Sequence, residues 1–302
     1  MQSLPRRSFL IGGAAVALLA ACGGKSNSSA DTTASGATSG GSAGGGGSLA
    51  KGDELLMFQD PSSLVAGIDQ RFALGIRDAD GALTAGGPET LLLNLQDIDG
   101  KTIAAGLKAA RHQSASRSYW VTSYRFDQPG NYQLVSDKAG HAAFTVQSKD
   151  KVLVPNTGDK MIPFDTPTTA DKHGVDPICT RDPICPFHTQ TLTQALGTGK
   201  PVAFLVATPA YCQTAVCGPV LDVLIGASKQ YADKIEFVHS EVYSAKFPPS
   251  GAQPPLAPAL DAYHLGFEPC LFLAGADGVI RQRLDVIYDN GEVTAALNAL
   301  VA

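Results

Sequence analysis

The sequence predicts an all-β sandwich domain followed by an α/β domain. Between residues 51 and 148, short apolar segments of strand length alternate with turn residues, as in antiparallel β-sandwiches. After residue 187 the segments alternate between helical and strand patterns, in the order βαβα and then ββα. A proline-rich stretch separates the two patterns, and we expect it to connect the domains.

The composition restricts the classes of partner. The chain has 302 residues, enough for two domains, and its 28 acidic and 23 basic side chains nearly balance. A chain of this kind has no general electrostatic attraction to nucleic acid, and we expect no nucleic-acid partner.

The first residues have the features of an export signal. Arg6 and Arg7 precede the apolar run Phe9–Ala21, which is too short for a membrane-spanning helix of about 20 residues and is typical of a signal peptide. Leu19-Ala20-Ala21-Cys22 resembles a lipobox, and Arg6-Arg7-Ser8-Phe9-Leu10 resembles a twin-arginine signal. We therefore expect residues 1–21 to be removed and Cys22 to carry lipid, including palmitate. The protein would then be anchored on the extracytoplasmic face of the cell membrane. An uncleaved anchor or an ordinary secretory signal is the alternative.

Residues 22–50 follow as a linker of Gly, Ser, Ala and Thr, which has too little apolar surface to fold. The sandwich is expected over residues 51–148. Its turns contain Pro-Gly and Asp-Gly pairs, and its predicted strands are Leu55–Phe58, Phe72–Ile76, Leu91–Leu95, Tyr119–Tyr124, Tyr132–Val135 and Ala143–Val146. Gly130-Asn131-Tyr132 resembles the tyrosine corner of immunoglobulin-like domains. Tyr119 and Trp120 are interpreted as core residues, with a ligand surface as the alternative.

Residues 149–187 form the proline-rich connector, and residues 188–302 form the α/β domain. We predict helices at 188–196, 218–231, 256–265 and 293–301, and strands at 201–207, 235–242, 270–274 and 279–286.

Three features of this domain resemble the thioredoxin superfamily, in particular its exported TlpA-like branch. The apolar strand ending at Ala207 leads into a segment with Cys212 and Cys217, where the family has its redox cysteines. Glu268-Pro269 precedes the next strand, at the place of the family's cis-proline, and Asp277-Gly278 forms the following turn. The resemblance implies that Cys212 attacks disulfides, that Cys217 resolves the mixed disulfide, and that Pro269 lies beside them.

The spacing of the two cysteines departs from the family, which has two residues between them where this chain has four. Five positions along a continuous helix correspond to a rise of about 7.5 Å, whereas a disulfide joins Cα atoms about 4.4–6.8 Å apart. Either Cys212 lies in a loop before the helix, or the helix unwinds. Pro219 favours a helix that begins late, near Gly218. The pair could also be a structural disulfide.

Two other families on this fold are alternatives. Some peroxiredoxins have the same cysteine spacing, with a threonine and an arginine near the reactive thiolate. Here the candidates are Thr208, Arg281 and Arg283, although Thr208 is displaced by one residue. Sco-like proteins bind copper through two cysteines and a histidine, for which His239 and His264 are candidates.

The remaining cysteines are expected to be structural. Cys179 and Cys185 are predicted to form a local disulfide in an oxidising compartment. Zinc binding by Cys179, Cys185 and His188 is the alternative, but the sequence offers no obvious fourth ligand. Cys270 is expected to be a buried thiol, or else to trap mixed disulfides.

The sequence thus predicts a membrane-tethered protein that exchanges thiols and disulfides with exported proteins, with no cofactor and no bound metal. A non-catalytic binding module is the competing hypothesis, because β-sandwich domains commonly recognise partners and fold alone does not fix function.

Overall fold

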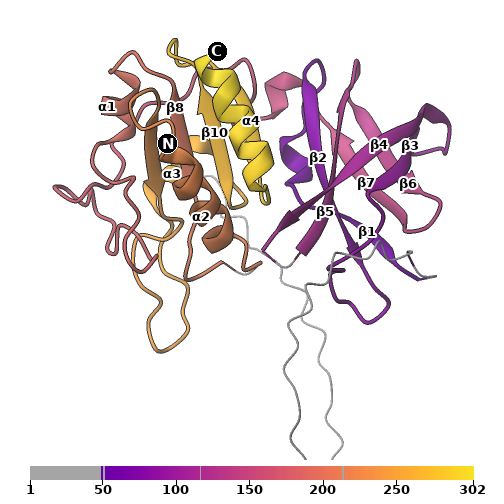
Figure 1. The fold of residues 1–302 in the computed structure, drawn as a ribbon, viewed down its shortest axis with the longest axis horizontal. Helices are drawn as coiled ribbons and strands as arrows, with labels where there is room; N and C mark the ends of the chain where they lie inside the picture. Colours follow the sequence, from indigo (N-terminus) through magenta and orange to yellow (C-terminus); the bar gives the residue numbers. More distant parts are fainter. Residues whose placement is uncertain (1–48, 50–51, 116, 213) are drawn as a thin grey trace, which may run out of the picture. The chain divides into compact units, whose positions relative to one another are not determined.

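The computed structural model describes residues 49, 52–115, 117–212 and 214–302 (Figure 1). The expected signal peptide, the expected lipidation site Cys22 and almost all of the linker lie outside the described residues. Within the described ranges, every helix is too short or too polar to cross a membrane.

The first part of the described chain is a single antiparallel sheet of seven strands, in the order β1-β2-β5-β4-β3-β6-β7. The strands are β1 (Glu54–Met57), β2 (Asp69–Arg77), β3 (Thr90–Asp97), β4 (Thr102–Ser114), β5 (Arg117–Arg125), β6 (Gly130–Ser136) and β7 (Gly140–Val146). The N–H of Leu55 on β1 donates to the carbonyl of Ala139 beside β7 at 2.7 Å, so the sheet is nearly closed. Gln147, just after β7, also exchanges hydrogen bonds of 2.9 Å with Leu64 and Ala66.

The expected β domain is present, and its seven strands are joined in one continuous antiparallel sheet. The strands form one sheet because β4 pairs with both β3 and β5. The sequence pattern did not predict β4, since it is rich in alanine, which is depleted in strands, and most of its side chains are exposed or half-buried. Pairing with two neighbours stabilises β4 despite its weak intrinsic preference.

Both aromatic residues interpreted as core residues are buried: Trp120 lies in the core of this sheet, and Tyr119 lies in a second cluster with Val216 and Ile287 of the α/β part. Trp120 and Tyr119 are fully buried. The indole N–H of Trp120 donates to the carbonyl of Pro88 at 2.8 Å, which satisfies its one polar atom. The hydroxyl of Tyr132 donates to the carbonyl of Gln128 at 2.9 Å, four residues upstream, as in a tyrosine corner.

The second part contains a four-stranded sheet in the order β11-β10-β8-β9, in which β8 and β9 are parallel and the other pairs are antiparallel. Its elements are α1 (Leu192–Leu196), β8 (Val202–Val206), α2 (Cys217–Ser228), β9 (Glu236–Ser240), α3 (Pro258–Tyr263), β10 (Cys270–Ala274), β11 (Ile280–Asp285) and α4 (Asn290–Val301). All the predicted strands and helices of this part are present. The predicted first helix begins later, at Leu192, because the Thr191 side chain caps it by accepting from the N–H of Gln194.

The two central strands, β8 and β10, are fully buried on both faces. Alternate residues point to opposite faces of the sheet. Phe204 and Phe272 therefore lie in one apolar cluster, and Leu205 and Leu271 lie in the other. Helices cover both faces, which explains why these strands are continuous apolar runs in the sequence.

The connector between the two sheets has little regular structure beyond a short 3-10 turn at Lys149–Lys151. It contacts both edges of the four-stranded sheet. On β11, the N–H of Ile280 donates to the carbonyl of Asp159 at 2.8 Å, and on β9 the N–H of His239 donates to the carbonyl of Phe187 at 3.1 Å. The connector is therefore part of the folded domain.

Polar contacts join the seven-stranded sheet to the α/β part. Arg71 on β2 donates to both carboxylate oxygens of Glu292 on α4, at 2.8 and 2.9 Å, and Glu292 also accepts from the Tyr119 hydroxyl at 2.6 Å. His112 lies 2.9 Å from the carboxylate of Asp289, the N-cap residue of α4. His112, Asp289 and Glu292 therefore lie close together because Asp289 caps α4 and because Glu292 binds Arg71.

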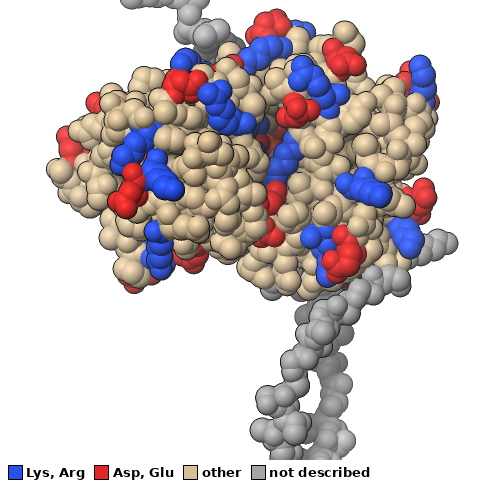
Figure 2. Space-filling model, turned by 45° about the horizontal axis from the view of Figure 1, so that its top comes forward, with Lys and Arg blue, Asp and Glu red and all other residues tan. Residues whose placement is uncertain are grey.

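The surface charges are mixed. On the face drawn in Figure 2, Lys and Arg side chains lie among Asp and Glu side chains, and uncharged residues form much of the surface.

Candidate functional site

Cys212 and Cys217 lie together where the chain passes from β8 to α2. Cys212 is in the loop and is half-buried, whereas Cys217 is the first residue of α2 and is fully buried. Their Sγ atoms are 2.6 Å apart. Of the two arrangements that the spacing left open, the structure has the one in which the helix begins late and Cys212 precedes it.

The surroundings of Cys212 favour its thiolate. The backbone N–H of Cys217 donates to its Sγ at 3.4 Å, and the Thr214 hydroxyl lies 3.3 Å from the same sulfur. Hydrogen bonds from the Cys217 thiol, from Thr214 and from backbone N–H groups lower the pKa of Cys212 to about 5, although burial opposes this. The hydrogen bond to Cys212, together with burial, raises the pKa of Cys217. At neutral pH the pair therefore consists of one thiolate and one thiol.

Pro269 lies beside the base of the cysteine loop. The Glu268–Pro269 peptide bond is cis, and Pro269 is buried immediately before β10. Cys270, the first residue of β10, pairs with Val206, the last residue of β8, so Pro269 lies just beyond this pair, near the point where the chain leaves β8. Burial, and then the negative charge of Cys212, raise the pKa of the half-buried Glu268. A carboxyl group thus lies within electrostatic reach of the thiolate.

The lowered pKa predicts a pH profile for the reduced protein. Only the thiolate reacts with iodoacetamide, so the rate of Cys212 alkylation should rise with a midpoint near pH 5 instead of the ordinary value of about 8.5. In Cys217→Ala the main hydrogen bond is lost, and the midpoint should move up towards the ordinary value. Mass spectrometry of the alkylated peptide measures both profiles, and an unshifted wild-type midpoint would contradict the assignment.

The same shift affects the stability of the reduced form. Folding lowers the pKa of Cys212, so the stabilisation is fully present above the unfolded pKa of about 8.5 and is lost as the pH falls through about 5.

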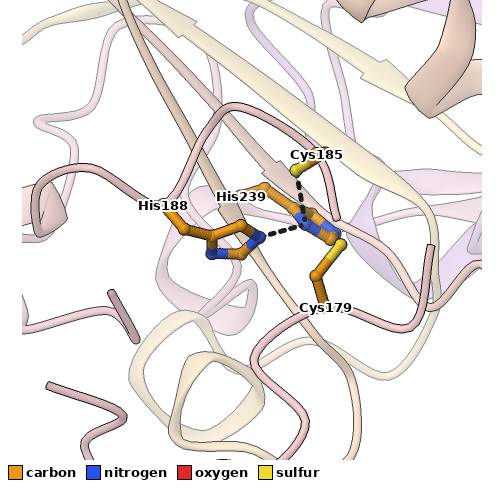
Figure 3. Close-up of side chains that lie close together, drawn as sticks. All are labelled: Cys179, Cys185, His188 and His239. Carbon is orange, nitrogen blue, oxygen red and sulfur yellow. Dashed lines mark hydrogen bonds between the residues drawn. The ribbon is translucent and has the colours of Figure 1, made fainter. Parts of the chain in front are cut away.

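Cys179 and Cys185 do not form the disulfide expected from the sequence, since both are free thiols in the structure. Instead they lie in a buried cluster with His188 and His239 (Figure 3). We call these four residues the Cys–His cluster. The Cys185 Sγ lies 3.5 Å from Nδ1 of His239, and Nε2 of His188 lies 3.1 Å from the same nitrogen.

Sequence reasoning missed His239 as a member of this cluster, because it assigned His239 only to a copper site with Cys212 or to the core. The folded chain brings His239 to the other three residues. Its strand, β9, lies parallel to β8 at the edge of the sheet, where the connector contacts it. A histidine directly after the apolar pair Phe237-Val238 of the predicted strand was the available signal.

The remaining candidates are occupied elsewhere. Cys270 is a fully buried thiol, as predicted, and donates to the Asp285 carboxylate at 3.1 Å. In a peroxiredoxin an arginine would contact the thiolate, here Cys212. Arg283 instead pairs with Asp285, and Arg281 pairs with Asp277. His264 is exposed at the end of α3, and the contacts of His239 are to the Cys–His cluster. The structure therefore does not assemble the Sco-like copper ligands around Cys212.

Comparison with known proteins does not assign a family. No family model matches the chain, and no curated protein matches it. Among solved structures, the crystal structure of the Lin-41 filamin domain is 16% identical and covers 33% of this chain and 97% of its own, with a TM-score of 0.23. Domains 6–7 of the surface layer protein SbsC are 11% identical and cover 74% of this chain and 91% of their own, with a TM-score of 0.21. Both likenesses are too slight to carry an argument about function.

Proposed function

We propose that this protein is a lipid-anchored, extracytoplasmic thiol–disulfide exchange protein that acts through Cys212 and Cys217. The observation that carries the proposal is the geometry of the pair. The sulfurs are 2.6 Å apart, one is half-exposed at the N-terminus of a helix, and the other is buried directly behind it. In such an arrangement Cys212 would attack the partner disulfide first, and Cys217 would then resolve the mixed disulfide.

The arrangement of the α/β part supports a thioredoxin-like fold as part of this proposal. The order β11-β10-β8-β9, with only β8 and β9 parallel, agrees with the βαβ and ββα order expected from the family resemblance. The cysteines follow β8 at the start of α2, and a cis-proline precedes β10. The order of the seven-stranded sheet likewise divides into β1-β2-β5-β4 and β3-β6-β7, the strand groups of immunoglobulin-like domains.

The exchange would proceed in two steps. The Cys212 thiolate attacks one sulfur of a partner disulfide, which forms a mixed disulfide and releases the partner's other sulfur as a thiolate that takes up a proton. The Cys217 thiol then loses its proton and attacks the Cys212 sulfur, which forms the Cys212–Cys217 disulfide and releases the partner's second thiolate. Two electrons pass from the pair to the partner, and the reverse sequence oxidises a partner dithiol.

Two neighbouring groups would assist these steps. Pro269 has no N–H, so the backbone near the end of β8 does not compete there for the thiolate. The Glu268 carboxylate, whose pKa is raised by burial and by Cys212, is suited to accept the proton of Cys217 when that residue attacks.

The location and partners follow from the N-terminal sequence. With Cys22 lipidated, the linker would place the folded part beside the extracytoplasmic face of the membrane, where exported proteins carry thiols and disulfides. Those proteins are the proposed partners.

Equilibration with glutathione redox buffers tests the function. We expect a reversible two-electron transition in which Cys212 and Cys217 are alkylatable in reducing buffers and protected in oxidising buffers, as read by mass spectrometry. Cys270→Ser, which removes a buried thiol, is the control and should titrate like the wild type. A pair that stays reduced in every buffer, or that resists dithiothreitol in the folded protein, would leave the binding-module hypothesis instead.

A further inference from the structure

We infer that Cys179, Cys185, His188 and His239 form a structural zinc site that fastens the connector to the edge strand β9. This revises the expectation that the chain binds no metal, and it does not depend on the proposed exchange function.

The four ligand atoms lie close to one another. One atom from each of the four residues lies within 4.8 Å of the other three. Tetrahedral zinc, with Zn–S about 2.3 Å and Zn–N about 2.0 Å, requires separations of about 3.3–3.8 Å between ligand atoms. The distances of 3.1 Å between the histidine nitrogens and 3.5 Å from Cys185 to His239 are close to this range. Only small movements would be needed to bind one ion.

The outer nitrogens of the two histidines show which way their lone pairs point. Nδ1 of His188 lies 3.3 Å from the carbonyl of Pro167, and Nε2 of His239 lies 3.0 Å from the carbonyl of Ala207. A carbonyl only accepts hydrogen bonds, so both of these nitrogens must carry the proton. If both rings are neutral, the inner nitrogens would then face each other with lone pairs at 3.1 Å, which is unfavourable unless a proton or a metal ion lies between them.

This is also the usual outer shell of a zinc site. Metal-bound histidines almost always donate their other N–H to a carbonyl or carboxylate, which fixes the orientation of the ring. A further contact positions Cys179: the carboxylate of Glu241 accepts from the N–H of Thr180 at 2.6 Å and from its hydroxyl at 2.9 Å.

Charge and burial favour a divalent ion in a closed site. The four residues are between 0 and 8% exposed, so no position is open for a substrate or a water, as in structural zinc sites. Two thiolates and two neutral imidazoles balance the charge of Zn²⁺, and a neutral centre avoids the cost of a buried net charge. A tetrahedral set of two sulfurs and two nitrogens is a typical zinc donor set.

The course of the chain indicates a structural role for the zinc site. Cys179 and Cys185 come from the connector, His188 follows it directly in the irregular segment before α1, and His239 comes from β9. Irregular segments of more than about 15 residues are uncommon inside compact domains unless something holds them in place. Zinc at this position would hold the connector against the sheet and maintain the pairing of Phe187 with β9.

Metal analysis of the full chain, purified in detergent under reducing conditions, tests the inference. We expect inductively coupled plasma mass spectrometry to find about one zinc ion per chain. His239→Ala and Cys185→Ser should lose the zinc and unfold at a lower temperature. His264→Ala, which removes an exposed histidine, and Cys212→Ser, which removes a thiol outside the cluster, are the matched controls and should keep it.

A measurement on the wild type avoids reliance on variants that fail to fold. X-ray absorption at the zinc edge should show two sulfur and two nitrogen neighbours, at about 2.3 and 2.0 Å. Cobalt substitution should give the visible bands of a tetrahedral site with thiolate ligands. A wild type that takes up no zinc under reducing conditions, a different donor set, preferential retention of copper, or a Cys179–Cys185 disulfide in the reduced preparation would each overturn the inference.

Discussion

Cys212→Ser is expected to lower disulfide exchange to the uncatalysed rate, whereas Cys217→Ser is expected to accumulate mixed disulfides. Serine cannot replace the thiolate at Cys212, because its hydroxyl is not ionised near neutral pH. Cys217→Ser leaves the first nucleophile in place but removes the buried sulfur, 2.6 Å away, that would release the partner. The two substitutions should therefore fail at different steps.

Reduction of insulin in the presence of dithiothreitol measures the rate, and non-reducing electrophoresis with mass spectrometry detects the mixed disulfides. The control is Cys270→Ser, whose sulfur is buried against Asp285, and it should keep the wild-type rate. Exchange that survives in Cys212→Ser, or mixed disulfides that form on a cysteine other than Cys212, would contradict the assigned roles.

Arg283→Met is expected to lower the free energy of unfolding by about 3–5 kcal/mol, which is the usual cost of removing one partner from a buried ion pair. The side chains of Arg283 and Asp285 are only 7 and 11% exposed, and their charged groups are 2.8 Å apart. Arg283 also donates to the Pro155 carbonyl at 3.0 Å and to the Ser63 hydroxyl at 2.8 Å. The substitution would leave the Asp285 carboxylate buried without its cation.

Arg281→Met, two residues earlier on β11, provides a matched control. Arg281 pairs with Asp277 at the surface, where the side chains are 54 and 49% exposed, so its loss should cost at most about 1 kcal/mol. Guanidinium chloride unfolding of both variants measures the difference. The double variant Arg283→Met/Asp285→Leu should recover much of the stability, because no buried charge remains. Equal costs at the two arginines would show that the ion pair is not the cause.

The elements that could be predicted from the sequence are those whose local pattern and tertiary environment agree. The buried strand at 270–274 is a continuous apolar run, and the structure has β10 at those residues. The late start of α2 followed from Pro219, which fits a first helical turn and not a helix interior. Strand β4 was missed because its side chains are largely exposed and pairing with two neighbours, not composition, stabilises it.

The Cys–His cluster shows a different limit. Cys179, Cys185 and His188 are close in sequence and were recognised as a possible ligand set, but His239 is 54 residues after Cys185. Only the parallel pairing of β8 and β9, and the course of the connector along β9, bring it into contact. Because the chain was expected to be exported, two nearby cysteines indicated a disulfide. The sequence does not show that His239 lies close to them.

The edge strands of the two sheets affect the tendency of this protein to aggregate with its own copies. Across the described part of the chain, the hydrogen bonds of Leu55 and Gln147 nearly close the seven-stranded sheet, and the connector contacts both β11 and β9. The unpaired N–H and C=O groups of an edge strand can pair with another polypeptide. In this protein the edge strands are contacted by other parts of the same chain. Neighbouring copies of the protein would thus resist strand-by-strand aggregation. Under the proposed exchange function, a partner protein would be recognised through loops and side chains, not through an added strand.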